Sequence, residues 1–346
     1  CRELSERLTA FMHERVYPAE AVFAEQLDAL GDPHGEVAVL EELQEQARTF
    51  GAALVASGIE PRDRIAIWTP DCPLPTMRLN PAVKDHLPYQ VAMLEEVRRQ
   101  AHKFDVLHFH IDLLHFPLIR DFSDRTVTTL HGRLDLPDLR PFYEAFPDVP
   151  LVSISNDQRR PMPPVHWAGT VYHGLATDGL PFTAQQGNYL AFLGRISPET
   201  RPDRAIQIAA KAGMPLKMAA KIDNADKVYW ESVIEPMVKS HPNVEFIGEI
   251  NEHQKAEFLG NAAALLFPID WPEPFGLVMI EAMACGTPVI AFNCGSVPEV
   301  IDAGISGLIV DTVTEAVENV EWALRMDRRK VREAFEKRFS AKRMAS

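Results

Sequence analysis

The sequence has few cysteines and no long apolar run. Its 346 residues include only 4 cysteines, at positions 1, 72, 285 and 294, without Cys-x-x-Cys spacing. This usage argues against a disulfide-rich secreted protein and is typical of free thiols in a reducing compartment. No stretch approaches the length of a membrane span, and no signal peptide is evident. We therefore expect a cytoplasmic protein with no integral membrane part.

Positive charge and metal-binding patterns are also scarce. The formal net charge is −14, which argues against non-specific binding to nucleic acid but is compatible with a local basic pocket for a diphosphate. The sequence contains no Asp-x-Asp triplet, the pattern typical of a metal-binding donor site. The nearest approach is Asp135 and Asp138, which are three positions apart instead of two. His108 and His110 alternate along one strand and Asp112 follows, but the sequence offers no further ligand for a metal site. We expect no metal and no required cofactor.

Length and patterning predict two α/β domains. Hydrophobic residues make up 46% and charged residues 24% of the chain, as in ordinary globular proteins, and strands that alternate with helices indicate parallel sheets. Residues 174–188 lack periodicity and are the predicted interdomain linker. The predicted strands are 64–69, 105–110, 125–131, 151–155, 169–173, 189–194, 216–220, 244–247, 264–268, 288–292 and 308–310. The predicted helices lie within 3–30, 40–57, 87–104, 113–120, 201–212, 226–240, 251–261, 275–285 and 328–344.

The stretch 270–285 carries the clearest chemical signal. Pro272 and Pro274 stiffen a loop, Gly276 allows close backbone approach, and an apolar helix follows. Glu281 interrupts the apolar pattern of that helix, and a carboxylate at such a position needs hydrogen-bond donors. Two sources of donors remain open, namely the hydroxyls of a nucleotide ribose and a paired Lys or Arg.

A second carboxylate, Glu273, lies eight residues before Glu281, at the mouth of the same helix. The helix N-terminus between them presents free backbone N–H groups, which favour phosphate. The stretch therefore offers, in order, a carboxylate that can bind hydroxyls, a helix N-terminus that can bind phosphate, and a second carboxylate that can bind hydroxyls. A nucleotide-sugar has the same layout.

The run Glu273-Pro-Phe-Gly through Glu281, with Ala284-Cys-Gly-Thr-Pro-Val-Ile-Ala after it, resembles the glutamate–seven residues–glutamate motif of retaining GT-B glycosyltransferases of family four (glycosyl transferases group 1). Gly295-Ser-Val-Pro-Glu-Val and Gly194-Arg-Ile-Ser-Pro-Glu extend the similarity. It covers about residues 80–346.

This resemblance implies two Rossmann-like domains facing across a cleft. The expected domains are an acceptor-side domain at 1–176, whose first 72 residues are atypical, and a nucleotide-sugar-binding domain at 186–327. Helix 328–346 is expected to pack back toward the first domain. The first part departs from the family, since no Gly-Gly pair occurs before Asn80 to form the usual glycine-rich loop.

The resemblance also implies roles for individual residues. The family has a Lys five positions after Arg195, but Thr200 stands there, so we expect Arg201 or Lys221 to replace it. Arg201 is otherwise a surface charge at a helix start, and His131 is otherwise a strand-end histidine bonded to backbone. The expected catalytic residues are His131 and Glu273, and the expected donor-binding residues are Arg195, Arg201, Lys221, Ile247, Gly248, Phe275, Gly276, Leu277 and Glu281.

The leading hypothesis is a metal-independent retaining glycosyltransferase that moves a sugar from a nucleoside-diphosphate sugar, with a UDP-sugar as the expected donor, to a hydroxyl acceptor. The alternative is a nucleotide-sugar-binding or scaffold protein with weak or no activity, because the glycine-rich loop and the Lys are missing. Residues 8–20 and 42–72 resemble pieces of an acyl-CoA dehydrogenase and an adenylate-forming ligase, without either active site. They suggest a chimeric N-terminus and a third hypothesis, an acyl-CoA enzyme. The expected partners are these small molecules and no nucleic acid, and a homodimer is left open.

Overall fold

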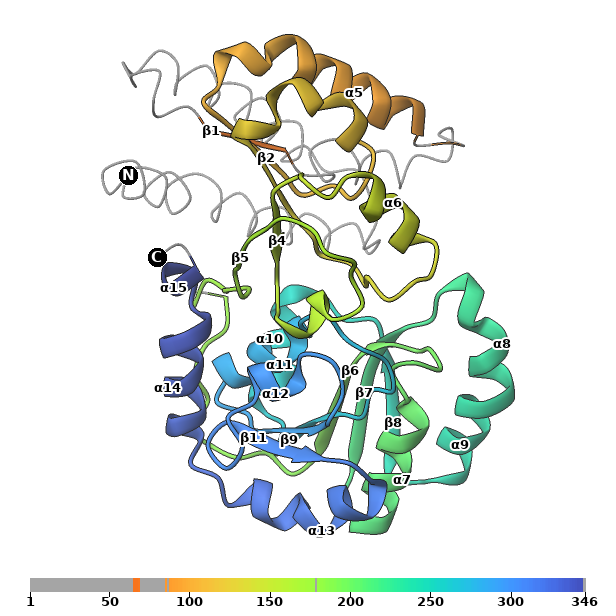
Figure 1. The fold of residues 1–346 in the computed structure, drawn as a ribbon. Helices are drawn as coiled ribbons and strands as arrows, with labels where there is room; N and C mark the ends of the chain where they lie inside the picture. Colours follow the sequence, from red (N-terminus) through yellow and green to blue (C-terminus); the bar gives the residue numbers. More distant parts are fainter. Residues whose placement is uncertain (1–64, 69–84, 86, 178, 345–346) are drawn as a thin grey trace. The chain divides into compact units, whose positions relative to one another are not determined.

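The computed structural model describes residues 65–68, 85, 87–177 and 179–344 (Figure 1). These residues form two units. Unit 1 contains those up to Gly132 together with 136–153 and 162–170, and unit 2 contains 133–135, 154–161 and those from Val171 onward. The helices predicted within 3–30 and 40–57, and the atypical segment 1–72 except for 65–68, lie outside the described residues. The predicted domain limits stay predictions.

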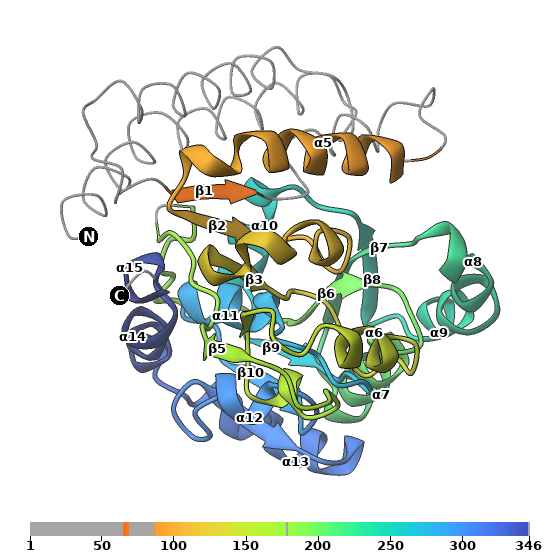
Figure 2. The ribbon, with the colours of Figure 1, turned by 45° about the horizontal axis from the view of Figure 1, so that its top comes forward.

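Unit 1 is built on a parallel sheet whose described strands follow chain order, β1-β2-β3-β4-β5. Leu107 and Phe109 of β2 are fully buried, while Val106 and His108 are only partly buried, as the period of a strand requires. Helix α5 (Leu87–Gln100) runs beside β1 and β2 (Figure 2). The strands are β1 (Ile65–Trp68), β2 (Val106–Phe109), β3 (Thr126–Thr129), β4 (Leu151–Ser153) and β5 (Trp167–Thr170), and the other helix is α6 (Leu139–Ala145).

The short helix predicted over 113–120 is present only as 3-10 structure and is not an α-helix. Two 3-10 turns, η4 (Phe116–Leu118) and η5 (Arg120–Arg125), occupy the region instead. Leu113 has a φ of 67°, in the left-handed region, so it cannot start an α-helix. The short 3-10 turns η3 (Ala101–Lys103) and η6 (Asp157–Arg159) complete the connections before β2 and after β4.

Unit 2 contains a six-stranded parallel sheet in the order β11-β10-β9-β6-β7-β8. Counted from β6, this is the doubly wound order 3-2-1-4-5-6, so the direction of winding reverses between β6 and β9. The predicted α/β class with parallel sheets is confirmed. The strands are β6 (Leu190–Arg195), β7 (Leu216–Lys221), β8 (Val244–Gly248), β9 (Ala264–Phe267), β10 (Val289–Phe292) and β11 (Gly307–Val310).

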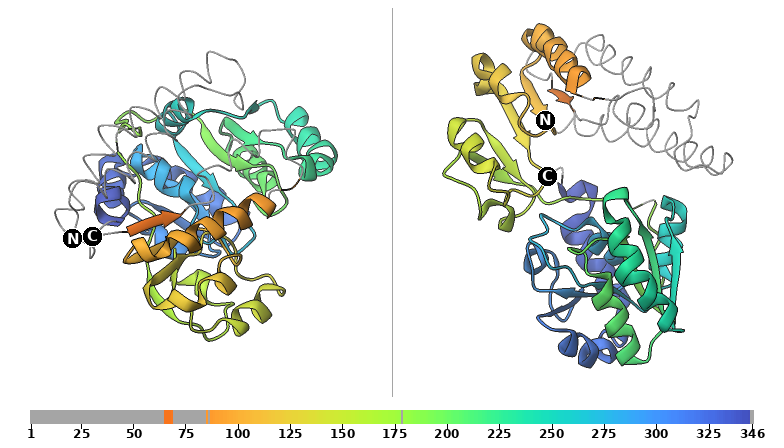
Figure 3. Two further views of the ribbon diagram at one scale, coloured as in Figure 1. Left: turned by 90° about the horizontal axis from the view of Figure 1, so that it is seen from above. Right: turned by 90° about the vertical axis from the view of Figure 1, so that its right-hand side faces the viewer.

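Helices cover both faces of this sheet (Figure 3). One layer contributes the cluster around Ile206, Ile234 and Val320, and the other contributes the cluster around Met283 and Phe335. The first layer contains α7 (Pro202–Ala212), α8 (Lys227–Tyr229), the π-helical turn η8 (Trp230–Ile234), α9 (Glu235–Ser240) and α13 (Val313–Leu324), the last of which the sequence analysis did not predict. The second contains α10 (Glu252–Gly260), α11 (Leu277–Ala284), α12 (Val297–Val300) and α14 (Arg328–Phe339), which a short α15 (Ala341–Met344) follows.

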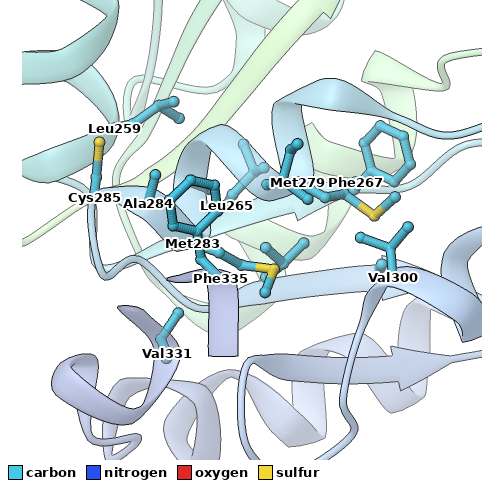
Figure 4. Close-up of a cluster of buried hydrophobic side chains, with 14 of the residues drawn as sticks. Leu259, Leu265, Phe267, Met279, Met283, Ala284, Cys285, Val300, Val331 and Phe335 are labelled. Atoms are coloured by element: carbon cyan, nitrogen blue, oxygen red, sulfur yellow. The ribbon is translucent and has the colours of Figure 1, made fainter. Parts of the chain in front are cut away.

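Helix α11 is the central helix of the second layer. It contacts β9 and β10 on one side and α14 on the other, and Figure 4 shows Met279 and Met283 among side chains of both neighbours. Both methionines are fully buried. The all-round apolar character predicted for this helix is therefore explained by its position between a sheet and a second helix.

A buried guanidinium fastens α14 to the rest of unit 2. Arg328 is only 6% exposed and donates hydrogen bonds to the carbonyl oxygens of Thr183, Ala262 and Gly260 and to the Thr287 hydroxyl. Burial lowers the pKa of Arg328. One side chain thus joins the start of α14 to the end of α10 and the segment after α11. None of the helices in the described part of the chain is long and apolar enough to cross a membrane.

We expect Arg328→Met to lower the free energy of unfolding by about 3 kcal/mol or more, because several buried carbonyl oxygens lose their donor at once. Urea denaturation followed by circular dichroism measures this. Arg329→Met is the matched control, since Arg329 is the next residue of α14 and is exposed. Equal losses in the two variants would contradict the role assigned to Arg328.

Candidate functional site

The reversal of winding between β6 and β9 marks the candidate site of unit 2. In doubly wound sheets, ligands bind outside the carboxyl ends of the strands where the order reverses. The segments that leave β6 and β9 are joined there, because the Asp270 N–H donates to the Glu199 carbonyl oxygen at 2.8 Å. Arg195 ends β6, and Glu273 lies in the loop that follows β9. The two residues therefore belong to adjoining segments at one edge of the sheet.

Two cations lie at this edge. Arg195 and Lys221 are register partners at the carboxyl ends of β6 and β7, and their side chains are 52% and 50% exposed. Arg195 is 3.8 Å from Glu199 and 3.6 Å from Asp226, while Lys221 is 3.2 Å from Asp223. Exposed ion pairs of this kind are weak. Both cations can therefore exchange a carboxylate for an anionic ligand at little cost.

Arg201 is placed differently from these two cations. Its guanidinium forms ion pairs with Asp203 at 2.8 Å and Asp270 at 2.7 Å, and these carboxylates, Asp203 first, raise its pKa. The Thr200 hydroxyl donates to the Arg195 carbonyl oxygen at 2.6 Å. Of the two proposed replacements for the missing Lys, Lys221 is thus the more available for a ligand.

Glu273 occupies the loop that leads into α11. Burial raises the pKa of Glu273, whereas hydrogen bonding from the backbone N–H groups of Phe275 and Gly276 opposes the rise. Gly276 caps the helix with a φ of 79°, and a Cβ there would lie 2.7 Å from the Met279 side chain. This position therefore requires glycine.

The first turn of α11 keeps donors available. Within the described part of the chain, the N–H groups of Leu277 and Val278 have no hydrogen-bond partner, and no side chain caps the helix. Such groups favour an anion at a helix N-terminus. Leu277 is 44% exposed, so this end of α11 is accessible to solvent.

The loop that holds Glu273 is fixed by a second loop, at Gly295 and Ser296. Ser296 donates from its N–H to the Glu273 carbonyl oxygen at 3.0 Å and from its hydroxyl to the Phe275 carbonyl oxygen at 2.9 Å. Gly295 has a φ of 58°, and a Cβ there would lie 2.4 Å from the Glu273 nitrogen. In the sequence, Gly295-Ser296 is recognisable only as part of a family resemblance, and this positioning role was not predicted from it.

Glu281 is paired with a lysine. Lys255 Nζ lies 2.9 Å from Glu281 Oε1, and the two side chains are 16% and 15% exposed. One of the two open sources of donors for this carboxylate, a Lys or Arg, is therefore present. The sequence analysis did not name Lys255, and no local pattern links α10 to α11.

Ile247 and Gly248 end β8, next to β7 in the sheet. Gly248 has a φ of 80°, and the register with β7 shifts between Met218 and Ala219. Ile247 is 37% exposed. Both residues thus lie at the same edge as Lys221.

In unit 1, two predicted residues come together after β2 and β3. His110 Nδ1 lies 2.7 Å from His131 Nε2, and the rings stack with centroids 5.0 Å apart. His108 Nε2 lies 2.8 Å from Thr129 Oγ1, and burial, followed by the charge of His131, lowers the pKa of His108. No group of His, Cys, Asp or Glu side chains in the described ranges is arranged to hold a metal ion.

We expect Glu273→Gln to stabilise the protein at pH 7. The raised pKa means that the folded state keeps its proton to a higher pH than the unfolded state, whose glutamate ionises near pH 4.3. Stability from this group is therefore present at acid pH and lost as the pH rises through the raised pKa. Thermal unfolding from pH 3 to pH 8 should show a gain for the variant that disappears toward pH 3.

The control for this series is Glu245→Gln, which changes a glutamate whose side chain is 60% exposed. A stability difference for Glu273→Gln that grows as the pH falls would contradict the assignment.

Part of the chain is similar in sequence to known proteins. The profile of the family described as "Glycosyl transferases group 1" matches residues 182–340. D-inositol 3-phosphate glycosyltransferase from Mycolicibacterium smegmatis is 31% identical over 172 residues, which are 46% of this chain and 39% of that protein. The protein of that name from Mycobacterium leprae is 33% identical over 144 residues, 39% of this chain and 31% of the relative. The matches thus span less than half of these relatives.

Solved structures share the fold at low sequence identity. Anabaena Alr3699/HepE in complex with UDP and glucose superposes with a TM-score of 0.61 at 14% identity, covering 73% of this chain and 79% of that chain. Sucrose-phosphate synthase from Thermosynechococcus elongatus gives a TM-score of 0.60 at 20% identity, covering 73% and 74%. AviGT4, a glycosyltransferase involved in avilamycin A biosynthesis, gives 0.56 at 20% identity, covering 73% and 75%. The described part of the chain shares the fold of the GT-B glycosyltransferases, and its residues 182–340 match the profile of the glycosyl transferases group 1 family.

Proposed function

We propose that this chain is a glycosyltransferase that takes a sugar from a nucleoside-diphosphate sugar, with a UDP-sugar as donor. One observation carries the proposal: two cations with weakly bound carboxylates, the half-buried Glu273 carboxylate and a helix N-terminus with open N–H groups all belong to the carboxyl edge of the unit 2 sheet. Cations and open N–H groups suit a diphosphate, and a carboxylate suits sugar hydroxyls. The complex of Alr3699/HepE with UDP and glucose supports the choice of donor.

The proposed roles follow the chemistry of each group. Arg195 and Lys221 neutralise the diphosphate, which gains charge as the glycosidic bond breaks. The N–H groups at the start of α11 add donors to the same oxygens. Glu273 accepts hydrogen bonds from the donor sugar, and Glu281 accepts them from the ribose.

The remaining proposed residues act at the two ends of the donor. Backbone at Ile247 and Gly248 contacts the base, and Phe275 and Gly276 hold Glu273 in place. Arg201 keeps its two aspartates and supports the donor site indirectly through Asp270. In unit 1, His131 is the proposed catalytic side chain, and His110 holds its ring.

We further propose retention of configuration without a metal ion. The acceptor hydroxyl attacks the anomeric carbon from the face that the diphosphate leaves. The bond from this carbon to the phosphate oxygen breaks as the bond to the acceptor oxygen forms. An oxygen of the leaving phosphate takes the acceptor proton, so the protein supplies electrostatic stabilisation instead of a base.

A second candidate function is binding of a nucleotide-sugar with little or no transfer. It is favoured by Thr200, which stands at the family's Lys position and bonds to the Arg195 carbonyl oxygen, and by Arg201, whose charge is balanced by two carboxylates. The diphosphate would then meet one cation fewer on this side. Release of nucleoside diphosphate separates the two functions.

We expect one of the UDP-, GDP- or ADP-sugars to raise the melting temperature of the wild-type chain and not that of Glu281→Ala. A ligand present at about 100 times its dissociation constant stabilises the fold by about 2.7 kcal/mol. Glu318→Ala, at an exposed position of α13, is the control and should keep the full shift. If none of the three donors shifts the wild-type chain, the proposed function is wrong.

We expect Thr200→Lys to raise the rate of nucleoside-diphosphate release about tenfold or more, because it adds a charge where charge develops on the leaving group. Thr200→Met is the matched control, since it removes the same hydroxyl and its bond to Arg195 without adding a charge. Steady-state kinetics with the donor identified above measure the effect. Equal rates for the two variants would show that position 200 does not contact the diphosphate.

A further inference from the structure

The ion pair between Lys255 and Glu281 is the feature that the proposed roles leave unexplained. Its two side chains are 16% and 15% exposed, and its N–O distance is 2.9 Å. The ion pair of Lys221 with Asp223, at the edge of the sheet, has side chains that are 50% and 37% exposed. A largely buried pair brings little net stability, because desolvation of both charges offsets their attraction. Its position therefore calls for a role other than stability.

Lys255 lies near the start of helix α10. The helix starts with a capping box between Asn251 and Gln254, and the Lys255 N–H donates to the Asn251 carbonyl oxygen at 2.8 Å. Lys255 thus belongs to the first turn, where the helix dipole favours acidic and not basic side chains. The Glu281 carboxylate on α11 is a partner of this lysine.

The geometry of the pair leaves one carboxylate oxygen available. Lys255 bonds to Glu281 Oε1, and no described residue donates a hydrogen bond to Oε2. The carboxylate is held from one side by a short, charge-assisted bond, which fixes its orientation. The other oxygen can accept a hydroxyl without first giving up a protein partner.

We propose that Lys255 is a positioning residue of the nucleotide site, which orients Glu281 so that its free oxygen accepts a hydrogen bond from a ribose hydroxyl. This inference rests on the proposed function. Lys255 acts through Glu281 and does not itself contact the phosphates. The part of the ligand whose binding depends on Lys255 is therefore the nucleoside. A nucleoside diphosphate and the corresponding free nucleoside should depend on Lys255 equally.

The test is calorimetric titration of the full chain with UDP and with uridine, or with the corresponding GDP or ADP pair if the wild type binds that nucleotide. We expect Lys255→Met to weaken both ligands by the same factor, about tenfold. Lys255→Arg should restore much of the loss, since it keeps the charge. The control is Lys239→Met, which removes a lysine from an ion pair of the same 2.9 Å length in which the lysine side chain is 69% exposed.

A double-mutant cycle tests whether Lys255 acts through Glu281. We expect Lys255→Met combined with Glu281→Gln to bind no more weakly than Glu281→Gln alone. The double variant also leaves no unpaired buried charge, so it serves if Lys255→Met fails to fold. Independent, additive losses would overturn the inference.

The remaining outcomes distinguish a failure of the role proposed for Lys255 from a failure of the proposed function. A loss for Lys255→Met that is larger for UDP than for uridine means that Lys255 contacts the phosphates, and it overturns the positioning role. Unchanged binding in Lys255→Met overturns the inference and leaves the proposed function intact. A wild-type chain that binds none of the nucleotides overturns both.

Discussion

The candidate site depends on the packing of the loop at Gly295 and Ser296 against the backbone of the loop that holds Glu273. Ser296 binds the backbone on either side of Pro274, and Gly295 allows an approach that any side chain would block. The two hydrogen bonds from Ser296 fix the path of the Glu273 loop through its carbonyl oxygens. The carboxylate therefore remains available for a ligand while its position is determined by the sheet and by α12.

The cations at the edge of the sheet are all paired with carboxylates, but these ion pairs differ in strength. Arg201 is fixed by two aspartates at 2.7 and 2.8 Å, whereas the half-exposed side chains of Arg195 and Lys221 lie 3.2 to 3.8 Å from their carboxylates. The difference separates cations that maintain structure from cations that can neutralise a diphosphate. Acidic neighbours also keep the edge from becoming a general anion-binding surface, in agreement with the net charge of −14.

Helix α11 connects the packed core of unit 2 to the candidate site. Its middle and end are packed between the sheet and α14, and Arg328 and Arg332 tie α14 to the segments around it. Its first turn is open, with Leu277 exposed. A helix held along most of its length can present fixed N–H groups and Glu281 to a ligand, because neither requires reordering on binding.

The sequence alone determined the α/β class, the strands of both sheets and the positions of Glu273, Gly276 and Glu281, because periodicity, proline and glycine act locally. It did not determine the strand order, the 3-10 turns near Leu113, or α13. Contacts between distant segments were decided only by the tertiary structure: Lys255 with Glu281, His110 with His131, Ser296 with the Glu273 loop, and the buried Arg328. Each joins residues from different elements, and the physical reason is that packing sets such distances while local sequence carries no record of them.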